Sequence, residues 1–250
     1  MTALVEPGAP RRRAPDVWDD GPDDGSLPPW RPLARVLATR VLPVVVAWFA
    51  VLATVGWLLG HPLKEAIEPE DAVNRWFAAY RTDGWDTVTR VVSLMADTGT
   101  IVLTMVAAVL TYRMITHRLR EAVPLVVGVC SQALCFFSVT LLVDRERPQV
   151  TRLDESPPTS SFPSGHTGAA SALYVGLVIL CLRRFRSPWA RLATGVGFGL
   201  VPLAVAVSRV YRGMHHPSDV VFGLLNGMVC ALVAYLVLTS AAGRHVGGRR

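Results

Sequence analysis

The chain has 250 residues, of which 51% are hydrophobic and only 18% are charged, and its mean hydropathy is +0.38. This composition is too apolar for a soluble domain with a fully hydrated surface, so it indicates an integral membrane protein. A formal net charge of +6 would suggest a nucleic-acid partner in a soluble protein. Here the positive charge gathers in particular loops, and we expect no nucleic-acid partner.

The first 30 residues contain six prolines, five aspartates and few aliphatic side chains. Such a segment cannot bury enough apolar surface to offset the entropy of ordering, so we expect residues 1–30 to be a disordered tail. Residues 31–242 are predicted to form one membrane domain. Residues 243–250 are predicted to form a short basic tail on the cytoplasmic side.

Six stretches are long and apolar enough to cross a bilayer, which takes about 20 residues per helix. The first is too long for a signal-peptide core and lacks a small-residue cleavage site, so we expect it to remain as a helix. The sequence therefore predicts an all-α bundle of six transmembrane helices, at 41–60, 91–112, 122–143, 166–182, 192–208 and 220–240. The four cysteines lie within these stretches and predict neither a disulfide nor a metal site.

The arginines indicate how the bundle is oriented. Two short loops, 113–121 and 183–191, hold seven arginines and one acidic residue between them. Such loops remain on the cytoplasmic side of a membrane. Both termini are then cytoplasmic, and the segments 61–90, 144–165 and 209–219 face outward. The protein is expected to be a multi-pass protein of the plasma membrane.

The outward segment 61–90 mixes charged residues with Trp76, Phe77, Tyr80 and Trp85. This composition suits the headgroup layer of a membrane. An interfacial helix that shapes lipid entry is one interpretation. The sequence favours a plain connector that carries an aromatic belt.

Three polar clusters follow or precede predicted helices on the outward side: "DRERP" at 144–148, "PSGH" at 163–166 and "SRVYRGMHHPSD" at 208–219. Ionisable residues at the membrane boundary are costly unless they pair or line a polar site. Because the topology puts all three clusters on one side, they predict a shared pocket.

The second cluster has the features of an anion site. Ser164 is a plausible N-cap, and Gly165 and His166 would occupy the first turn of the helix. Unpaired backbone N–H groups and the positive end of the helix dipole favour an anion at such a position. Gly165 would let a ligand approach the backbone closely.

The third cluster supplies a nucleophile and an acid. His215 and Asp219 are four residues apart, so the carboxylate can reach the imidazole if a helix begins near Pro217. An imidazole oriented in this way is an activated nucleophile. Arg147 and Arg209 add fork-shaped donors that bind phosphate oxygens. Together these residues predict phosphoryl transfer without a metal.

These clusters resemble the three motifs of the type 2 phosphatidic acid phosphatase (PAP2) superfamily, K-x6-RP, PSGH and SR-x5-H-x3-D, over about residues 90–235. The resemblance implies that His215 forms a phosphohistidine, that Asp219 orients it and that His166 protonates the leaving oxygen. It also implies that no metal or other cofactor takes part. The phosphate would be held by Arg147, Arg209, Ser164 and the Gly165 amide.

The first motif departs from the family pattern, because Thr140 stands where the family has lysine. The chain has one lysine, Lys64, which is far from that position in the sequence. We hypothesise that Arg145 supplies the missing positive charge to the phosphate. Asp144 and Glu146 are the partners that would compete for it.

Other polar residues have simpler interpretations. His61, His117 and His245 are expected to be solvated, and His216 to be a bystander rather than a headgroup contact. Asp97 either faces the pocket or caps a helix locally, and the cap is favoured. Arg212 is interpreted either as a contact to a second phosphate or as a solvated charge at the rim.

The sequence thus predicts a membrane lipid phosphatase with an extracytoplasmic active site. Phosphatidic acid, phosphatidylglycerol phosphate and undecaprenyl pyrophosphate represent the expected substrate class. A lipid-linked phosphotransferase is an alternative on the same scaffold. Thr140 also leaves open a non-catalytic phospholipid-binding or transport protein. The related vanadate haloperoxidases are soluble, so six spans argue against that interpretation.

Overall fold

A computed structural model describes residues 30–65, 67, 69–155 and 158–243 of the chain. The predicted N-terminal tail lies outside the described residues except for Trp30, and the predicted basic tail lies outside them except for Gly243. His245 is also outside them. The statements below concern the described residues.

Six helical segments are long and apolar enough to cross a membrane, which confirms the predicted all-α architecture with six spans. Large apolar side chains on their outer surfaces, such as Leu103 at 72% and Leu141 at 67% exposed, face away from the protein as a lipid-facing surface would. The first span consists of α1 (Trp30–Val36), the π-helical turn Leu37–Val41 and α2 (Leu42–Gly60). The others are α5 (Thr98–Thr116), α6 (Val123–Leu142, preceded by the 3-10 turn Leu119–Ala122), α7 (Gly165–Arg184), α8 (Pro188–Tyr211) and α9 (Pro217–Gly243).

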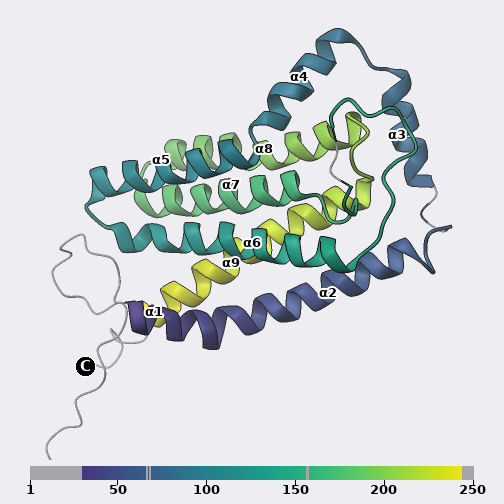
Figure 1. Ribbon diagram of the computed structural model, residues 1–250. Helices are drawn as coiled ribbons and strands as arrows, with labels where there is room; N and C mark the ends of the chain where they lie inside the picture. The colour runs from purple at the N-terminus through teal and green to yellow at the C-terminus, as the bar shows by residue number, and fades with distance from the viewer. Residues whose placement is uncertain (1–29, 66, 68, 156–157, 244–250) are drawn as a thin grey trace, which may run out of the picture.

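Helix α7 forms the centre of the bundle, in contact with α5, α6, α8 and α9 (Figure 1). More than half of its span is buried inside the protein, a larger share than for any other span. Leu173 and Ala170, both 0% exposed, belong to its core-facing surface. The N-terminus of α7, which carries the PSGH sequence, is therefore held by neighbours on several sides.

Helices α7 and α9 approach each other closely enough to require glycine. A Cβ atom built on Gly227 of α9 would lie 2.3 Å from the Gly168 carbonyl oxygen and 2.5 Å from the Ala172 nitrogen. Both are backbone atoms, which cannot rotate away. We therefore expect Gly227→Ala to lower the free energy of unfolding by at least roughly 1–3 kcal/mol.

The matched control for this prediction is Gly199→Ala on α8, where a Cβ would meet nothing within 4 Å. Alanine is the better helix former by about 1 kcal/mol, so this variant should be unchanged or more stable. The melting temperature of each purified variant in detergent is the measurement. Equal melting temperatures for the two variants would contradict the predicted clash.

Segment 61–90 is not the plain connector that the sequence favoured. It contains two helices, α3 (Pro69–Ala79) and α4 (Asp83–Leu94). The start of α4 is capped by the Thr82 side chain, which accepts a hydrogen bond from the Trp85 backbone nitrogen at 3.3 Å. The sequence offered a helix here only as the less favoured interpretation, because these helices are short and rich in charge.

The second span begins later than predicted, at Thr98 rather than at residue 91. Residues 91–94 belong to α4, and a short non-helical turn at residues 95–97 separates α4 from α5. The Asp97 carboxylate accepts a hydrogen bond from the Gly99 nitrogen at 3.1 Å and so caps α5. The local cap favoured for Asp97 is therefore confirmed.

One end of the bundle gathers the segments that were predicted to carry the chemistry. Helices α3 and α4, the long connection between α6 and α7, and the turn between α8 and α9 all lie at this end (Figure 1). The connections α5–α6 and α7–α8 lie at the opposite end. All four cysteines are free thiols. The three polar clusters of the sequence thus share one end of the protein.

Candidate active site

The turn between α8 and α9 presents His215. Gly213 has a φ of +71°, which lets the chain reverse direction directly after α8. Helix α9 then begins at Pro217, as predicted, with His216 at its N-cap. The Asp219 carboxylate accepts a hydrogen bond from the His216 backbone nitrogen at 2.8 Å. This contact from the third residue of α9 back to the N-cap nitrogen fixes the first turn of α9 and the residue that precedes it.

The imidazole of His215 is held in one tautomer. Its Nδ1 lies 2.8 Å from the Ser161 carbonyl oxygen, which can only accept, so Nδ1 carries the proton and Nε2 carries the lone pair. Burial lowers the pKa of His215, the Asp219 carboxylate opposes this shift, and the charges of Arg209 and Arg147 add to it. The neutral, nucleophilic form of the ring is therefore favoured.

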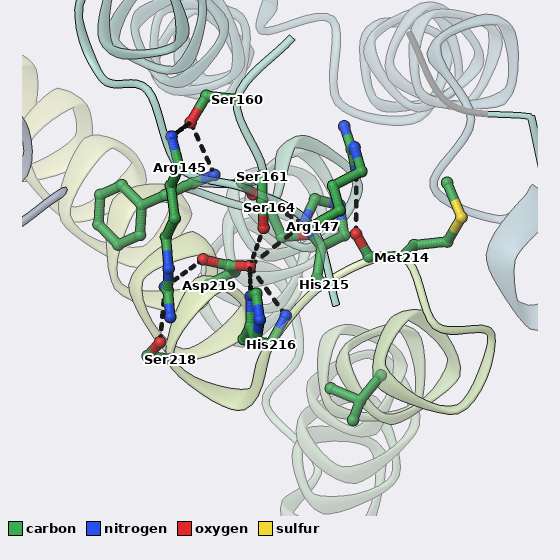
Figure 2. A network of polar contacts seen from close by, with 12 residues as sticks. Arg145, Arg147, Ser160, Ser161, Ser164, Met214, His215, His216, Ser218 and Asp219 are labelled. Carbon is green, nitrogen blue, oxygen red and sulfur yellow. Dashed lines mark hydrogen bonds and ion pairs between the residues drawn. The ribbon is translucent and has the colours of Figure 1, made fainter. Parts of the chain in front are cut away.

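Asp219 acts on His215 through Ser161 rather than by the direct hydrogen bond that the four-residue spacing predicted. Its Oδ2 lies 3.8 Å from the His215 Nδ1, which is too long for a hydrogen bond. The same oxygen accepts a hydrogen bond from the Ser161 hydroxyl. Figure 2 shows Ser161 beside both side chains, and its carbonyl and hydroxyl groups contact His215 and Asp219 respectively. Sequence reasoning missed this serine, although it stands two residues before the PSGH sequence.

Arg145 is the buried partner of Asp219. Its Nη1 donates to the Asp219 Oδ1 at 2.5 Å and to the Ser218 hydroxyl at 2.8 Å, and its Nη2 lies 3.2 Å from Glu70 (Figure 2). Two carboxylates thus neutralise this guanidinium. The structure places Arg145 on Asp219, and its hypothesised role as a cation for the phosphate stays a prediction.

The expected competitors of Arg145 have other positions. Glu146 pairs with Lys64, with 3.1 Å between the two charged groups, and Asp144 is exposed. Neither carboxylate pairs with Arg145, so the partners predicted from their neighbouring positions were wrong. The carboxylates that do pair with Arg145 are Glu70 of α3 and Asp219 of α9.

Arg209 reaches the site from the last turn of α8 and is only 4% exposed. Its Nη1 donates to Asp154 at 2.8 Å and to the Ser93 hydroxyl at 2.7 Å. Its Nε is buried and has no hydrogen-bond partner among the described residues. Asp154 and Ser93 thus hold the guanidinium in place and leave its Nε as an unused donor. The sequence analysis did not single out Asp154 or Ser93.

Arg212 is neither the rim charge nor the contact to a second phosphate that we considered. It is 4% exposed and binds Asp154 with two hydrogen bonds, of 2.8 Å from Nε and 2.6 Å from Nη2. Burial alone would raise the pKa of Asp154, but Arg212 and Arg209 hold it below its ordinary value. The carboxylate is therefore charged and ties the α6–α7 connection to the end of α8.

Arg147 is the second arginine with a donor to spare. Its Nη1 donates to the Met214 carbonyl at 2.8 Å (Figure 2), and its buried Nε has no partner among the described residues. Burial lowers the pKa of Arg147, with the charge of Asp219 opposing the shift. A cation that has lost hydration in this way gains from a nearby anion.

The N-terminus of α7 forms as predicted, with Ser164 as its N-cap. The Ser164 hydroxyl accepts from the Thr167 nitrogen at 3.4 Å, and the Ser164 nitrogen donates to the Asp219 carbonyl at 3.0 Å. The start of α7 is thereby tied to the first turn of α9. Gly165 is required by packing, because a Cβ there would lie 2.7 Å from the ring of Phe136.

His166 follows in the first turn of α7 and is partly buried. It lies within electrostatic range of both Arg209 and His215. The charges of Arg209 and His215 therefore act on His166, which comes from a different part of the chain. The three polar clusters converge on one site, as their shared side predicted.

Comparison with known proteins agrees with this arrangement. The profile of the PAP2 superfamily matches residues 121–241, which include all the residues assigned above to the three clusters. Residues 121–241 of the chain are a PAP2 superfamily domain. A crystal structure described as the first transmembrane PAP2 type phosphatidylglycerolphosphate phosphatase from Bacillus subtilis has the same fold. It aligns with a TM-score of 0.65 and 18% identity, and covers 81% of this chain and 96% of that one.

Two curated relatives resemble shorter stretches of this PAP2 protein. Phospholipid phosphatase 1 of Rattus norvegicus is 38% identical over 82 residues, which are 32% of this chain and 29% of that protein. The putative undecaprenyl-diphosphatase YbjG of Escherichia coli (strain K12) is 36% identical over 77 residues, which are 31% of this chain and 34% of that protein. The chain thus spans about a third of the length of these relatives.

His216 is more than a bystander in this PAP2 protein. Its Nδ1 lies 3.3 Å from Asp219 and its Nε2 lies 3.3 Å from Asp71 of α3. The other histidines fit their expected interpretation, since His61 and His117 are exposed. Thr140, at the position of the family lysine, donates to the Phe137 carbonyl of its own helix at 2.9 Å.

A cavity of about 610 Å³ opens beside the site of this PAP2 protein. It lies between the C-terminal end of α2, the segment that follows it and residues 144–149, and it shares Arg145, Arg147 and His216 with the polar network. Neither His166 nor His215 lines it. Within the described residues, no cluster of three or more His, Cys, Asp or Glu is arranged as a metal site.

Proposed function

We propose that this protein is a membrane phosphatase that hydrolyses a lipid phosphate or lipid pyrophosphate through a phosphohistidine on His215. One observation carries the proposal. A buried imidazole with a free lone pair on Nε2 shares its site with two arginines, Arg147 and Arg209, whose buried Nε groups have no partner among the described residues. A phosphoryl group would satisfy both guanidinium groups while the imidazole attacks it.

The reaction takes two steps. The Nε2 of His215 attacks phosphorus, the bond from phosphorus to the leaving oxygen breaks, and His166 gives that oxygen a proton. Water then attacks the phosphohistidine, His166 takes the proton of that water, and inorganic phosphate leaves with His215 regenerated. The nucleophile and the acid are thus ready for the next cycle.

The chain itself supplies the positive charge that this transition state requires. Arg147 and Arg209 offset the charge on the equatorial oxygens, and the backbone N–H groups at the start of α7 add the positive end of a helix dipole. We therefore propose that turnover needs no metal ion.

The substrate class follows from where the site lies. The site is at the ends of the spans, where the phosphate of a membrane lipid would be. Two relatives of this chain are named as a phospholipid phosphatase and as a putative undecaprenyl-diphosphatase. Both names support a lipid phosphate or pyrophosphate. The arginine-rich loops at 113–121 and 183–191 lie at the opposite end of the bundle, which supports an extracytoplasmic site in the plasma membrane.

The test is phosphate release by the purified protein in detergent, with EDTA present. The substrates are phosphatidic acid, phosphatidylglycerol phosphate and undecaprenyl pyrophosphate, and free phosphate is measured with malachite green. We expect release from at least one of them that EDTA does not abolish. No release from the whole panel would refute the proposal, and a phosphorylated acceptor in place of free phosphate would identify a phosphotransferase.

The pH dependence of turnover provides a second prediction. Protonation of His215 removes the lone pair that attacks phosphorus, so activity must fall on the acid side. Because burial lowers the pKa of His215 from 6.5, the neutral ring persists to lower pH and the acid limb of kcat/KM should have its midpoint below pH 6.5. Circular dichroism at each pH controls for unfolding. A midpoint at or above 6.5 in folded protein would contradict the prediction.

A further inference from the structure

Helix α3 presents three polar side chains to the turn that carries His215. Glu70 accepts a hydrogen bond from the Ser218 hydroxyl at 2.7 Å, and Asp71 lies 3.3 Å from the His216 ring. Asn74, one turn after Glu70, reaches the same turn from the same helix face. Figure 1 shows α3 against the end of the bundle where this turn lies.

Asn74 makes the most specific of these contacts. Its side chain is 0% exposed, and its Nδ2 donates to the Val210 carbonyl at 3.2 Å and to the His215 carbonyl at 3.1 Å. One amide group thus joins the last turn of α8 to the backbone of the proposed nucleophile. The two carbonyls are five residues apart and lie on either side of Gly213.

We propose that Asn74 is a positioning residue for the nucleophile, which it holds through the backbone of His215. This inference rests on the proposed function of His215. The turn contains a glycine with a positive φ. Other carbonyl groups of the turn also accept from Arg81, Arg147 or backbone N–H groups. By contrast, the only hydrogen bond to the His215 carbonyl among the described residues comes from Asn74. Loss of the Asn74 amide would leave this buried carbonyl without that partner, and the backbone at His215 would relax to satisfy it.

A small relaxation is enough to slow the reaction. Nucleophilic attack requires the reacting atoms to be close and aligned, and a displacement of about 1 Å can cost roughly 10²-fold in rate. Arg209 is anchored by Asp154 and Ser93, which lie outside the turn. Arg147 is carried by the connection between α6 and α7, and one of its bonds goes to Met214 in the turn. Loss of Asn74 should therefore reduce kcat far more than it reduces the affinity for phosphate.

The experiment compares Asn74→Leu with Asn226→Leu, the same change at the other asparagine of the chain. Leucine has the same branched arrangement of side-chain heavy atoms as asparagine, with bulkier methyl groups and no donor. Asn226 is also 0% exposed, and it bonds Trp48 at 3.1 Å and the Gln132 carbonyl at 3.4 Å within the bundle. Both variants lose a buried amide, and only Asn74→Leu changes the turn at His215.

We expect both variants to have lower melting temperatures than the parent protein. Per folded protein, kcat should fall by about 10²-fold in Asn74→Leu and stay near the parent value in Asn226→Leu. The inhibition constant of inorganic phosphate should stay unchanged in both. Equal kcat values for the two variants, or a loss in Asn74→Leu that appears only as weaker phosphate inhibition, would overturn the inference.

Hydrogen–deuterium exchange separates this inference from the proposed function, because it needs no turnover. Peptides that cover residues 208–219 should exchange faster in Asn74→Leu than in the parent protein, and should be unchanged in Asn226→Leu. If the parent protein hydrolyses no substrate but the exchange differs as expected, the proposed function fails and the positioning contact stands. Unchanged exchange in Asn74→Leu would refute the contact whatever the activity.

Discussion

His215→Asn should abolish phosphate release, with kcat reduced by about 10⁴-fold or more, as expected when the nucleophile of a covalent mechanism is removed. Asparagine has no nitrogen lone pair that can attack phosphorus. The asparagine side chain is close in size to the part of the histidine side chain nearest the backbone, so the turn should still form. The measurement is malachite-green detection of phosphate from the best lipid substrate, with EDTA present.

A single turnover with a substrate labelled in the transferred phosphoryl group tests the same step more directly. The parent protein should acquire label in an acid-labile bond, as a phosphohistidine would, and His215→Asn should acquire none. The control is His117→Asn, because His117 is exposed at the end of α5, far from the site, and its φ of 57° suits asparagine. Labelled protein in His215→Asn, or activity above a tenth of the parent value, would exclude His215 as the nucleophile.

The spans were predictable because the information for them is local. An apolar stretch of about 20 residues predicts a membrane-crossing helix without information from the rest of the chain. The N-terminal boundaries of α7 and α9 were predictable for the same reason, since Ser164 and Pro217 act on their own helix ends. The start of α5 was not, because the apolar residues at 91–94 resemble the span and belong to α4.

The motifs located the site but not its supporting contacts. Ser161, Asp154 and Ser93 hold His215 and Arg209 through bonds between residues 54 to 116 positions apart. No local pattern indicates such pairs, because each depends on how the helices and the α6–α7 connection pack. The spacing of four between His215 and Asp219 suggested a direct bond, whereas the fold places Ser161 between them.

The two helices that the sequence concealed support much of the site. Polar side chains recur every three or four positions at Glu70 and Asn74 and at Asp86, Thr89 and Ser93, which is typical of a solvated helix face. In the structure Thr89 accepts from Arg212, and Asn74 binds the backbone of His215. A polar stripe on a helix can therefore face either solvent or a buried polar site. Only the positions of the neighbouring helices and loops decide which.

Arg145→Met should destabilise the protein by about 3–5 kcal/mol, because it removes one partner of a buried ion pair and leaves the other uncompensated. Arg145 is 5% exposed and Asp219 is 0% exposed. Asp219 would keep only the hydrogen bonds of Ser161 and His216, and Glu70 would face the same space. Unfolding of the purified variant in mixed micelles with increasing SDS measures the loss.

The same variant distinguishes the structural role of Arg145 from the phosphate-binding role first suggested by Thr140. If Arg145 holds Asp219, then Arg145→Met/Glu70→Gln should recover part of the lost stability, because one of the two unpaired carboxylates is gone. The exposed Arg75 of α3 provides the control, since Arg75→Met removes the same charge without burial. A variant Arg145→Met with parental stability and a raised inhibition constant for inorganic phosphate would show instead that this arginine binds the substrate.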